Sequence, residues 1–289
     1  MHPTPLSYVH DLILILKTHQ KYIPMKRFRL QRFLALALIL AFAVSVRTAT
    51  AQDGADMSAK EIINANIEAT GGLKAWRSVK DLSVVAEIGI ELPGMGALLI
   101  NLESINIFPG YGYTSIEVAE APAAIPAEQI NQKAYYTPLE GWVEGAAGRQ
   151  DMNSLSPQQR TQFQRSSPKN ELDYLAYADS MLIRLDDRDL EGKSVFAIDV
   201  VTDGVSSTML YDKESFLMVA QEAETPAGPA ITYMSEFMEV DGLMFPGKTS
   251  VNMGGQNQVI TFKSIEVNSS VTPSSLATKA GVKKMVAPE

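Results

Sequence analysis

Residues 206–268 alternate short apolar runs with polar turns, a pattern typical of antiparallel strands. The run Ser207–Tyr211 is followed by a polar turn and then by a second run, Phe216–Ala220. Asp241 and Gly242 separate two further apolar runs. Asp-Gly at this position favours a type I′ turn, because both central residues of that turn need a positive φ. The stretch therefore predicts a curved, mostly antiparallel sheet.

The first half of the chain shows the same period of two. Leu82–Leu92 alternates apolar and polar residues, which predicts a half-buried strand. Pro93–Gly96 is the turn, and the return strand is apolar at even positions as far as Leu102. The apolar phase then shifts to Ile105, which predicts a β-bulge near Ser104.

Helical segments are expected at two places. Ser58 and Glu61 fit a capping box at the start of one helix, and a second helical region is expected to begin at Ser156. Asp186–Gly192 is interpreted as an acidic turn, and residues 271–289 as a polar C-terminal tail. The fold class predicted is α+β with mostly antiparallel β structure, in roughly nine to eleven strands within a single domain at 52–270.

The N-terminal residues have the pattern of a targeting signal. Lys26–Arg32 is basic, Phe33–Val46 is apolar and uncharged, and Ala49–Ala51 has the A-x-A form of a cleavage site. This pattern predicts a secretory signal peptide at 25–51, cleaved after Ala51, and hence a periplasmic protein. Residues 1–24 are interpreted as an upstream extension or a mis-assigned start. The alternative is a second apolar element.

Removing residues 1–51 changes the chemistry that is available. All three histidines lie in that segment, and the chain has no cysteine. The segment also holds seven of the 25 Lys and Arg and one of the 33 Asp and Glu, which leaves 18 basic against 32 acidic residues, a net charge near −14. Such a charge disfavours nucleic acid and anionic lipid headgroups as partners. Without His or Cys, the usual nucleophilic triads and zinc sites are excluded.

Three segments carry a resemblance to a known family: Glu68–Trp76, Tyr211–Glu214 and Val240–Pro246. They resemble recurring segments of bacterial outer-membrane lipoprotein-sorting-like proteins, the LolA/LolB-like half-barrel superfamily. The resemblance spans about residues 57–268. It implies an unclosed β-barrel whose concave apolar face is covered by helices and holds an acyl chain or another hydrophobic ligand.

Methionine and aromatic residues supply the candidate ligand-binding positions. Residues 52–289 contain 11 methionines, and Met suits a surface that must accept variable apolar partners, although an ordinary core would use it as well. The residues predicted to line a cavity are Trp76, Leu98, Ile100, Leu102, Tyr135, Trp142, Met209, Tyr211, Met218, Tyr233, Phe237 and Met253.

The main hypothesis for function is a non-catalytic periplasmic carrier that binds a lipid or a lipoprotein acyl chain, with the outer- or inner-membrane lipoprotein machinery as further partners. It is not expected to be an integral membrane protein or to need a cofactor or metal. A second hypothesis is a protein-interaction or sensor module that uses the same sheet. A third is a carboxylate-dependent hydrolase. The acidic residues Asp186–Asp189 lack the spacing of an EF-hand calcium loop.

Overall fold

The computed structural model describes residues 57–92, 94–154, 172, 174–202, 205–225, 228–253 and 256–282. The predicted signal peptide, residues 1–24 and the helix start at Ser156 lie outside them. The chain divides into two compact units. Unit 1 contains the described residues of 1–78 and 167–260, and unit 2 those of 79–166 and 261–289. The single domain predicted from the sequence stays a prediction.

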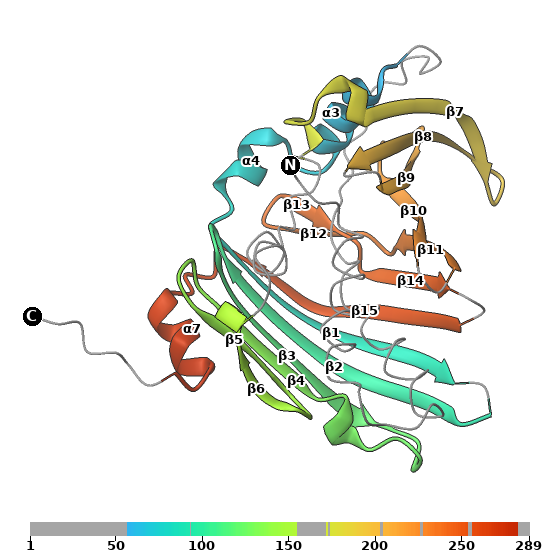
Figure 1. The fold of residues 1–289 in the computed structure, drawn as a ribbon. Coiled ribbons are helices and arrows are strands. Elements are labelled where there is room, and N and C mark those ends of the chain that lie inside the picture. Colours follow the sequence, from blue (N-terminus) through green and yellow to red (C-terminus); the bar gives the residue numbers. More distant parts are fainter. Residues whose placement is uncertain are drawn as a thin grey trace, which may run out of the picture. The chain divides into compact units, whose positions relative to one another are not determined.

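Unit 1 contains two N-terminal helices and most of the strands from the second half of the chain (Figure 1). The helices are α3 (Ala59–Ala69) and α4 (Leu73–Ser78), with a short 3-10 turn, η4 (Asp179–Met181). The strands are β7 (Leu182–Leu190), β8 (Lys193–Thr202), β9 (Val205–Asp212), β10 (Met218–Thr225), β11 (Gly228–Ser235), β12 (Met238–Val240), β13 (Leu243–Phe245) and β14 (Lys248–Met253). β15 (Gln256–Val267) begins in unit 1 and ends in unit 2.

Unit 2 contains the strands of the first half of the chain and one C-terminal helix. The strands are β1 (Asp81–Leu92), β2 (Gly96–Ile107), β3 (Tyr111–Glu120), β4 (Gln132–Tyr136), β5 (Gly141–Gly145) and β6 (Gly148–Asp151). The helix is α7 (Pro273–Lys279), and the 3-10 turns are η2 (Ala127–Gln129) and η3 (Met152–Ser154).

The described strands form one large sheet and one small hairpin. The hydrogen-bonding order of the large sheet is β6-β5-β4-β3-β2-β1-β15-β14-β11-β10-β9-β8-β7, and β12 pairs with β13. The order does not return to its first strand, so the sheet is unclosed, and the mostly antiparallel fold class predicted from the sequence is confirmed. The strands described exceed the predicted number because several, such as β6 and β12, are too short to show a period.

Unit 2 buries side chains on both faces of its sheet. Ile88 lies opposite Ile100 on one face. Ile105 lies opposite Tyr113 on the other face. The β-bulge predicted near Ser104 is wrong, because β1 and β2 pair without interruption along their whole length. The apolar phase shifts at Ile105 because the second face is also covered there.

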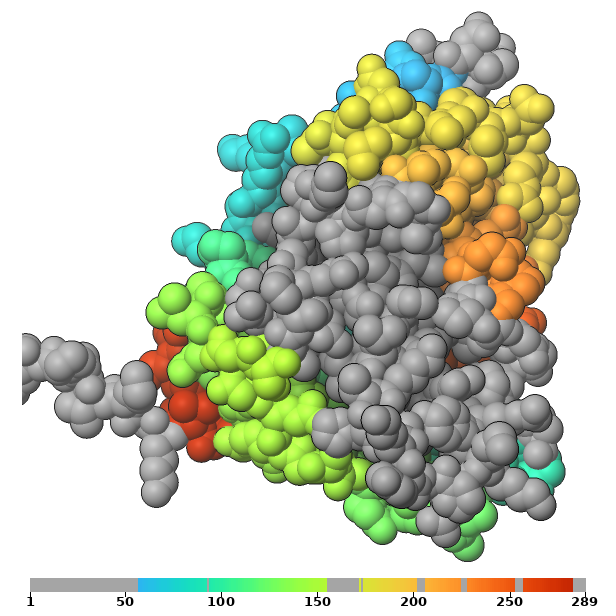
Figure 2. Space-filling model, in the orientation of Figure 1, coloured from blue at the N-terminus to red at the C-terminus, as the bar shows by residue number. Residues whose placement is uncertain are grey.

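The cover on this second face is α7. Leu276 and Ala280 pack in one cluster with Ile105, Tyr113 and other side chains of that face. Figure 2 shows α7 (red) beside the green strands of unit 2. Residues 271–289 were interpreted as a polar tail, but Pro273–Lys279 within them is helical. A capping box stabilises the start of the helix, and the buried Leu276, 1% exposed, packs it against the sheet.

The start of unit 1 joins two of the segments that carry the family resemblance. Ser58 and Glu61 form the predicted capping box. Asp241 and Gly242 both have a positive φ, 51° and 75°, as the predicted type I′ turn requires. Gly71 follows α3 with a φ of 112°, and an ideal Cβ built on it would lie 2.4 Å from the Gly242 carbonyl oxygen. Only glycine permits this close approach of the helix end to the hairpin turn.

The acidic segment of unit 1 is strand rather than turn. β7 continues to Leu190, and the turn that follows is confined to Glu191 and Gly192, with φ values of 56° and 84°. The prediction of a turn over Asp186–Gly192 is therefore wrong over most of its length. β7 lies at the end of the sheet order, where a strand can carry many charged residues on its exposed face.

Candidate ligand-binding face

One face of the unit 1 sheet gathers three buried apolar residues of the predicted site, Met209, Tyr211 and Met218. Met209 lies opposite Ile198, and Tyr211 lies opposite both Phe196 and Met218. Residues opposite one another in a ladder point to the same face. We call this surface the Met209 face. Its apolar members, none more than 5% exposed, are Phe196, Ile198, Val200, Met209, Tyr211, Met218, Met234 and Val251.

Buried polar residues interrupt the apolar side chains of the Met209 face. Gln221 lies opposite Met209 on β9 and opposite Thr232 on β11. Thr249 lies opposite Met234, and Ser207 lies opposite Val200. All four polar residues are uncharged, and they are 0–5% exposed. The face is thus apolar with a small number of neutral hydrogen-bonding groups, a composition typical of small-molecule sites.

The α3 helix is joined to the Phe196 side of this face. Phe216 stacks on Phe196 with the ring centroids 5.8 Å apart. The buried Asn66 of α3 donates from Nδ2 to the Phe216 carbonyl oxygen at 2.8 Å. Phe216 has a φ of 57°, an uncommon value for a bulky residue. The hydrogen bond from Asn66 therefore fixes both the helix and the turn that carries the stacked ring.

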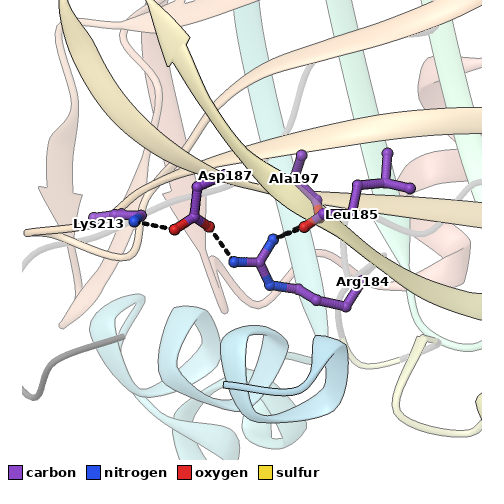
Figure 3. Close-up of polar contacts among 5 residues, drawn as sticks. All are labelled: Arg184, Leu185, Asp187, Ala197 and Lys213. Atoms are coloured by element: carbon purple, nitrogen blue, oxygen red, sulfur yellow. Dashed lines mark hydrogen bonds and ion pairs between the residues drawn. The ribbon is translucent and has the colours of Figure 1, made fainter. Parts of the chain in front are cut away.

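A cluster of charged residues lies over the same aromatic ring. Figure 3 shows its members Arg184 and Lys213, each in contact with Asp187. The Arg184 guanidinium and the Lys213 ammonium are each 5.2 Å from the centre of the Phe196 ring. Both cations form ion pairs with Asp187, and Arg184 also donates to the carbonyl oxygens of Leu185 and Ala197. Together these contacts tie β7 to β8 and to the turn after β9.

The ion pairs change the ionisation of Asp187. Partial burial of the carboxylate opposes its ionisation, but the hydrogen bonds from Lys213 and Arg184 outweigh burial and lower the pKa of Asp187. Asp187 therefore stays ionised to more acidic pH than an ordinary aspartate. The side chains are 21–32% exposed, so the cluster lies at a boundary between the apolar ring and solvent.

The remaining predicted residues of unit 1 lie elsewhere. Tyr233 is opposite Ala220 on the other face of the sheet, where it packs on a second apolar cluster. Phe237 is half-buried between β11 and β12. Met253 ends β14, and its side chain lies outside the described part of the structure. The structure thus brings Met209, Tyr211 and Met218 together and separates them from Tyr233.

Trp76 has a packing role at the end of α4. Its indole Nε1 donates to Thr70 Oγ1 at 2.7 Å, and its ring meets Phe245 edge-on with the centroids 5.6 Å apart. The side chain is 4% exposed. These contacts connect α4 to β13, so Trp76 serves the same helix–hairpin junction as Gly71.

The predicted residues of unit 2 divide between the two faces of its sheet. Leu98, Ile100 and Leu102 occupy every second position of β2, so they share one face, and they are 0–8% exposed. Tyr135 and Trp142 lie opposite each other on the other face, in the cluster covered by α7. These two groups therefore cannot line the same surface of unit 2.

Sequence reasoning missed the polar residues of the Met209 face. Thr249 occupies a strand position whose period-of-two neighbours, Gly247 and Val251, are buried, whereas the corresponding neighbours of Gln221, Val219 and Ala223, are only half-buried. A polar residue in the buried phase of a strand is the available signal, because such a residue needs a hydrogen-bond partner. In the described residues, no group of three or more metal-ligating side chains could hold a metal ion.

No protein-family model matches the chain, and no curated protein matches it. A DUF1329 family protein from Desulfovibrio piger is similar in structure, with a TM-score of 0.51 and 12% identity over 77% of this chain and 97% of that one. A LolA superfamily protein from Nitrosomonas europaea has a TM-score of 0.49 and 12% identity over 76% and 97% of the two chains. A domain described as an outer membrane lipoprotein-sorting protein, from Vibrio parahaemolyticus, has a TM-score of 0.47 and 11% identity, over 73% of this chain and 95% of that one.

At these identities the likeness concerns the fold alone. Within the described residues, no helix combines the length and apolar character needed to cross a membrane. The likeness to the DUF1329 family protein, whose TM-score is above 0.5, supports the fold class predicted from the sequence.

Proposed function

We propose that the protein is an exported, non-catalytic carrier that binds a lipid or a lipoprotein acyl chain. The observation that supports this most directly is the Met209 face, whose buried apolar side chains include three methionines, Met209, Met218 and Met234. A flexible thioether side chain adapts its shape to an apolar partner at little cost. Such a wall suits alkyl chains of variable shape better than it suits one rigid ligand.

Apolar burial supplies the driving force in this proposal. Each methylene group removed from water contributes about 0.8 kcal/mol. Ordering a flexible chain and restricting its motion offset part of that gain. A chain of a dozen or more methylenes thus has enough apolar surface to bind without any charged contact.

The sequence supports export and the lack of a catalytic role. Residues 52–289 contain neither His nor Cys, and binding an acyl chain requires neither residue. The predicted signal peptide at 25–51 would deliver the protein to the periplasm, where lipid and lipoprotein acyl chains must cross an aqueous space.

Native mass spectrometry and lipid extraction of the protein purified from the export compartment test the proposal. We expect co-purified acyl lipid, and displacement of a bound hydrophobic dye by added lipid. The variant Met209→Gln should weaken dye binding at least tenfold. Met209→Leu keeps the apolar volume and should retain binding.

Met238→Gln is the matched control, because Met238 is only half-buried, on β12 outside the large sheet. It should bind like the unmodified protein, and circular dichroism would confirm that each variant is folded. Absence of both co-purified lipid and dye binding would refute the carrier role. A stable protein partner recovered under those conditions would instead support the interaction module.

A further inference from the structure

Three buried polar atoms on the Met209 face have no hydrogen-bond partner among the described residues. They are Ser207 Oγ, Gln221 Nε2 and Thr249 Oγ1. Their residues are 2%, 5% and 0% exposed. More than nine in ten buried polar groups of folded proteins are paired, because an unpaired one is costly. Three unpaired groups on one face of one sheet therefore call for a specific explanation.

The strand register places the three groups in a diagonal band. Gln221 on β10 is the centre, with Thr232 directly beside it on β11. Ser207 lies two residues along β9 from Met209, which is opposite Gln221. Thr249 lies two residues along β14 from Val251, which is opposite Thr232. Ser207 and Gln221 are diagonal neighbours on adjacent strands, about 7–8 Å apart. Thr249 is the diagonal neighbour of Thr232 and lies two strands away from Gln221, so only an elongated ligand could contact all three groups.

The chemistry of the band is neutral. Gln221 Nε2 can only donate a hydrogen bond, whereas the Ser207 and Thr249 hydroxyls can donate or accept. None of the three carries a charge. The cations over Phe196, Arg184 and Lys213, already share Asp187. An ionised carboxylate or phosphate buried against this band would lack a compensating charge there, which makes its burial costly.

We propose that this band binds the neutral polar linkage of an acylated ligand, an ester or an amide, while the acyl chain lies on the surrounding apolar side chains. The linkage carbonyl accepts a hydrogen bond from Gln221 Nε2, and the neighbouring Ser207 hydroxyl contacts the same linkage. Thr249, two strands away from Gln221, contacts a different part of the elongated ligand. The inference rests on the proposed carrier function and specifies which class of acylated ligand the protein prefers. It predicts that ester- or amide-linked chains are preferred over free fatty acids and over plain alkanes.

Dye displacement with three probes of equal chain length tests the preference: N-methyldodecanamide, dodecanoate and dodecane. The unmodified protein should bind the amide at least tenfold more tightly than either other probe. Gln221→Met keeps the length of the side chain and removes the donor, so the advantage of the amide should fall below threefold, with the affinity for dodecane unchanged or higher. Gln132→Met, at a half-buried position on β4, should leave the preference intact.

A second readout needs no ligand. Removing an unpaired buried group relieves the cost of burying it, so Gln221→Met and Thr249→Val should each raise the melting temperature of the lipid-free protein by a few degrees. Ser207→Ala provides the preference test if Gln221→Met fails to fold, because Ser207 is the diagonal neighbour of Gln221.

The outcomes separate the two proposals. Equal binding of all three probes would overturn the polar band and leave the carrier role intact, whereas binding of none would overturn both. A lowered melting temperature in both variants together with an unchanged amide preference would show that the three groups serve the fold alone.

Discussion

The junction between the end of α3 and the β12–β13 turn offers a sharp test of what the family-like segments do. Replacing Gly71 by alanine introduces one methyl group at a φ of 112°. An ideal Cβ there would lie 2.4 Å from the Gly242 carbonyl oxygen and 2.8 Å from Leu243 Cδ2. The first contact is with backbone, so it cannot be relieved by a change of rotamer. The helix end or the hairpin must move.

Two separate costs add in Gly71→Ala. The positive φ costs a residue with a Cβ about 1–2 kcal/mol, and overpacking a well-packed site costs about 1–3 kcal/mol more. The free energy of unfolding should therefore fall by about 2–5 kcal/mol, a large fraction of the ~5–15 kcal/mol typical of folded domains. Movement of the hairpin would also disturb the contact between Trp76 and Phe245.

Gly192→Ala separates the two costs. Gly192 has a φ of 84°, but a Cβ there would meet nothing within 4 Å. This variant should lose only the ~1–2 kcal/mol due to the backbone conformation. Urea unfolding of both variants, followed by intrinsic tryptophan fluorescence, measures the difference. Equal destabilisation of the two would refute the close approach as the reason for glycine at position 71.

Three further predictions concern single contacts. Leu276→Ala should lower the free energy of unfolding by about 2–4 kcal/mol, and protease digestion should then cut within 271–282 before other sites. Asn66→Ala removes the hydrogen bond to Phe216 and should cost about 1–3 kcal/mol in urea unfolding; an unchanged midpoint would contradict this role. The lowered pKa of Asp187 means that its ion pairs stabilise the fold above the ordinary pKa of 3.8 and are lost as pH falls through the lower, folded value. The difference between the unmodified protein and Asp187→Asn, about 1 kcal/mol at pH 7 for pairs this exposed, should therefore vanish on titration toward pH 2, and a constant difference would exclude this cause.

Local features of the fold were predictable because their causes are local. The capping box of Ser58 and Glu61 and the turn of Asp241 and Gly242 follow from hydrogen bonding and backbone preference within four residues. The period of two also identified Leu82–Leu92 as strand, and β1 covers nearly the same residues. Residues close in sequence carry all the information that these elements need.

Features that depend on distant partners were not predictable in the same way. The shift of the apolar phase at Ile105 resembles a bulge unless one knows that α7 covers the second face. The separation of Tyr135 and Trp142 from Leu98 likewise follows from strand register, which one strand does not determine. The importance of Gln221 became visible only when its neighbours on β9 and β11 were known.

The two edge strands of the large sheet, β6 and β7, determine how readily the sheet would pair with strands of another chain. An exposed edge strand offers unpaired backbone groups to any other chain, and proteins guard such edges with short strands, charges and bulges. β6 has only four residues. β7 carries five charged residues among its nine, and its register against β8 is broken between Leu185 and Arg188. Both edges are thus poor templates for aggregation, which matters for a chain that has no disulfide to hold it together.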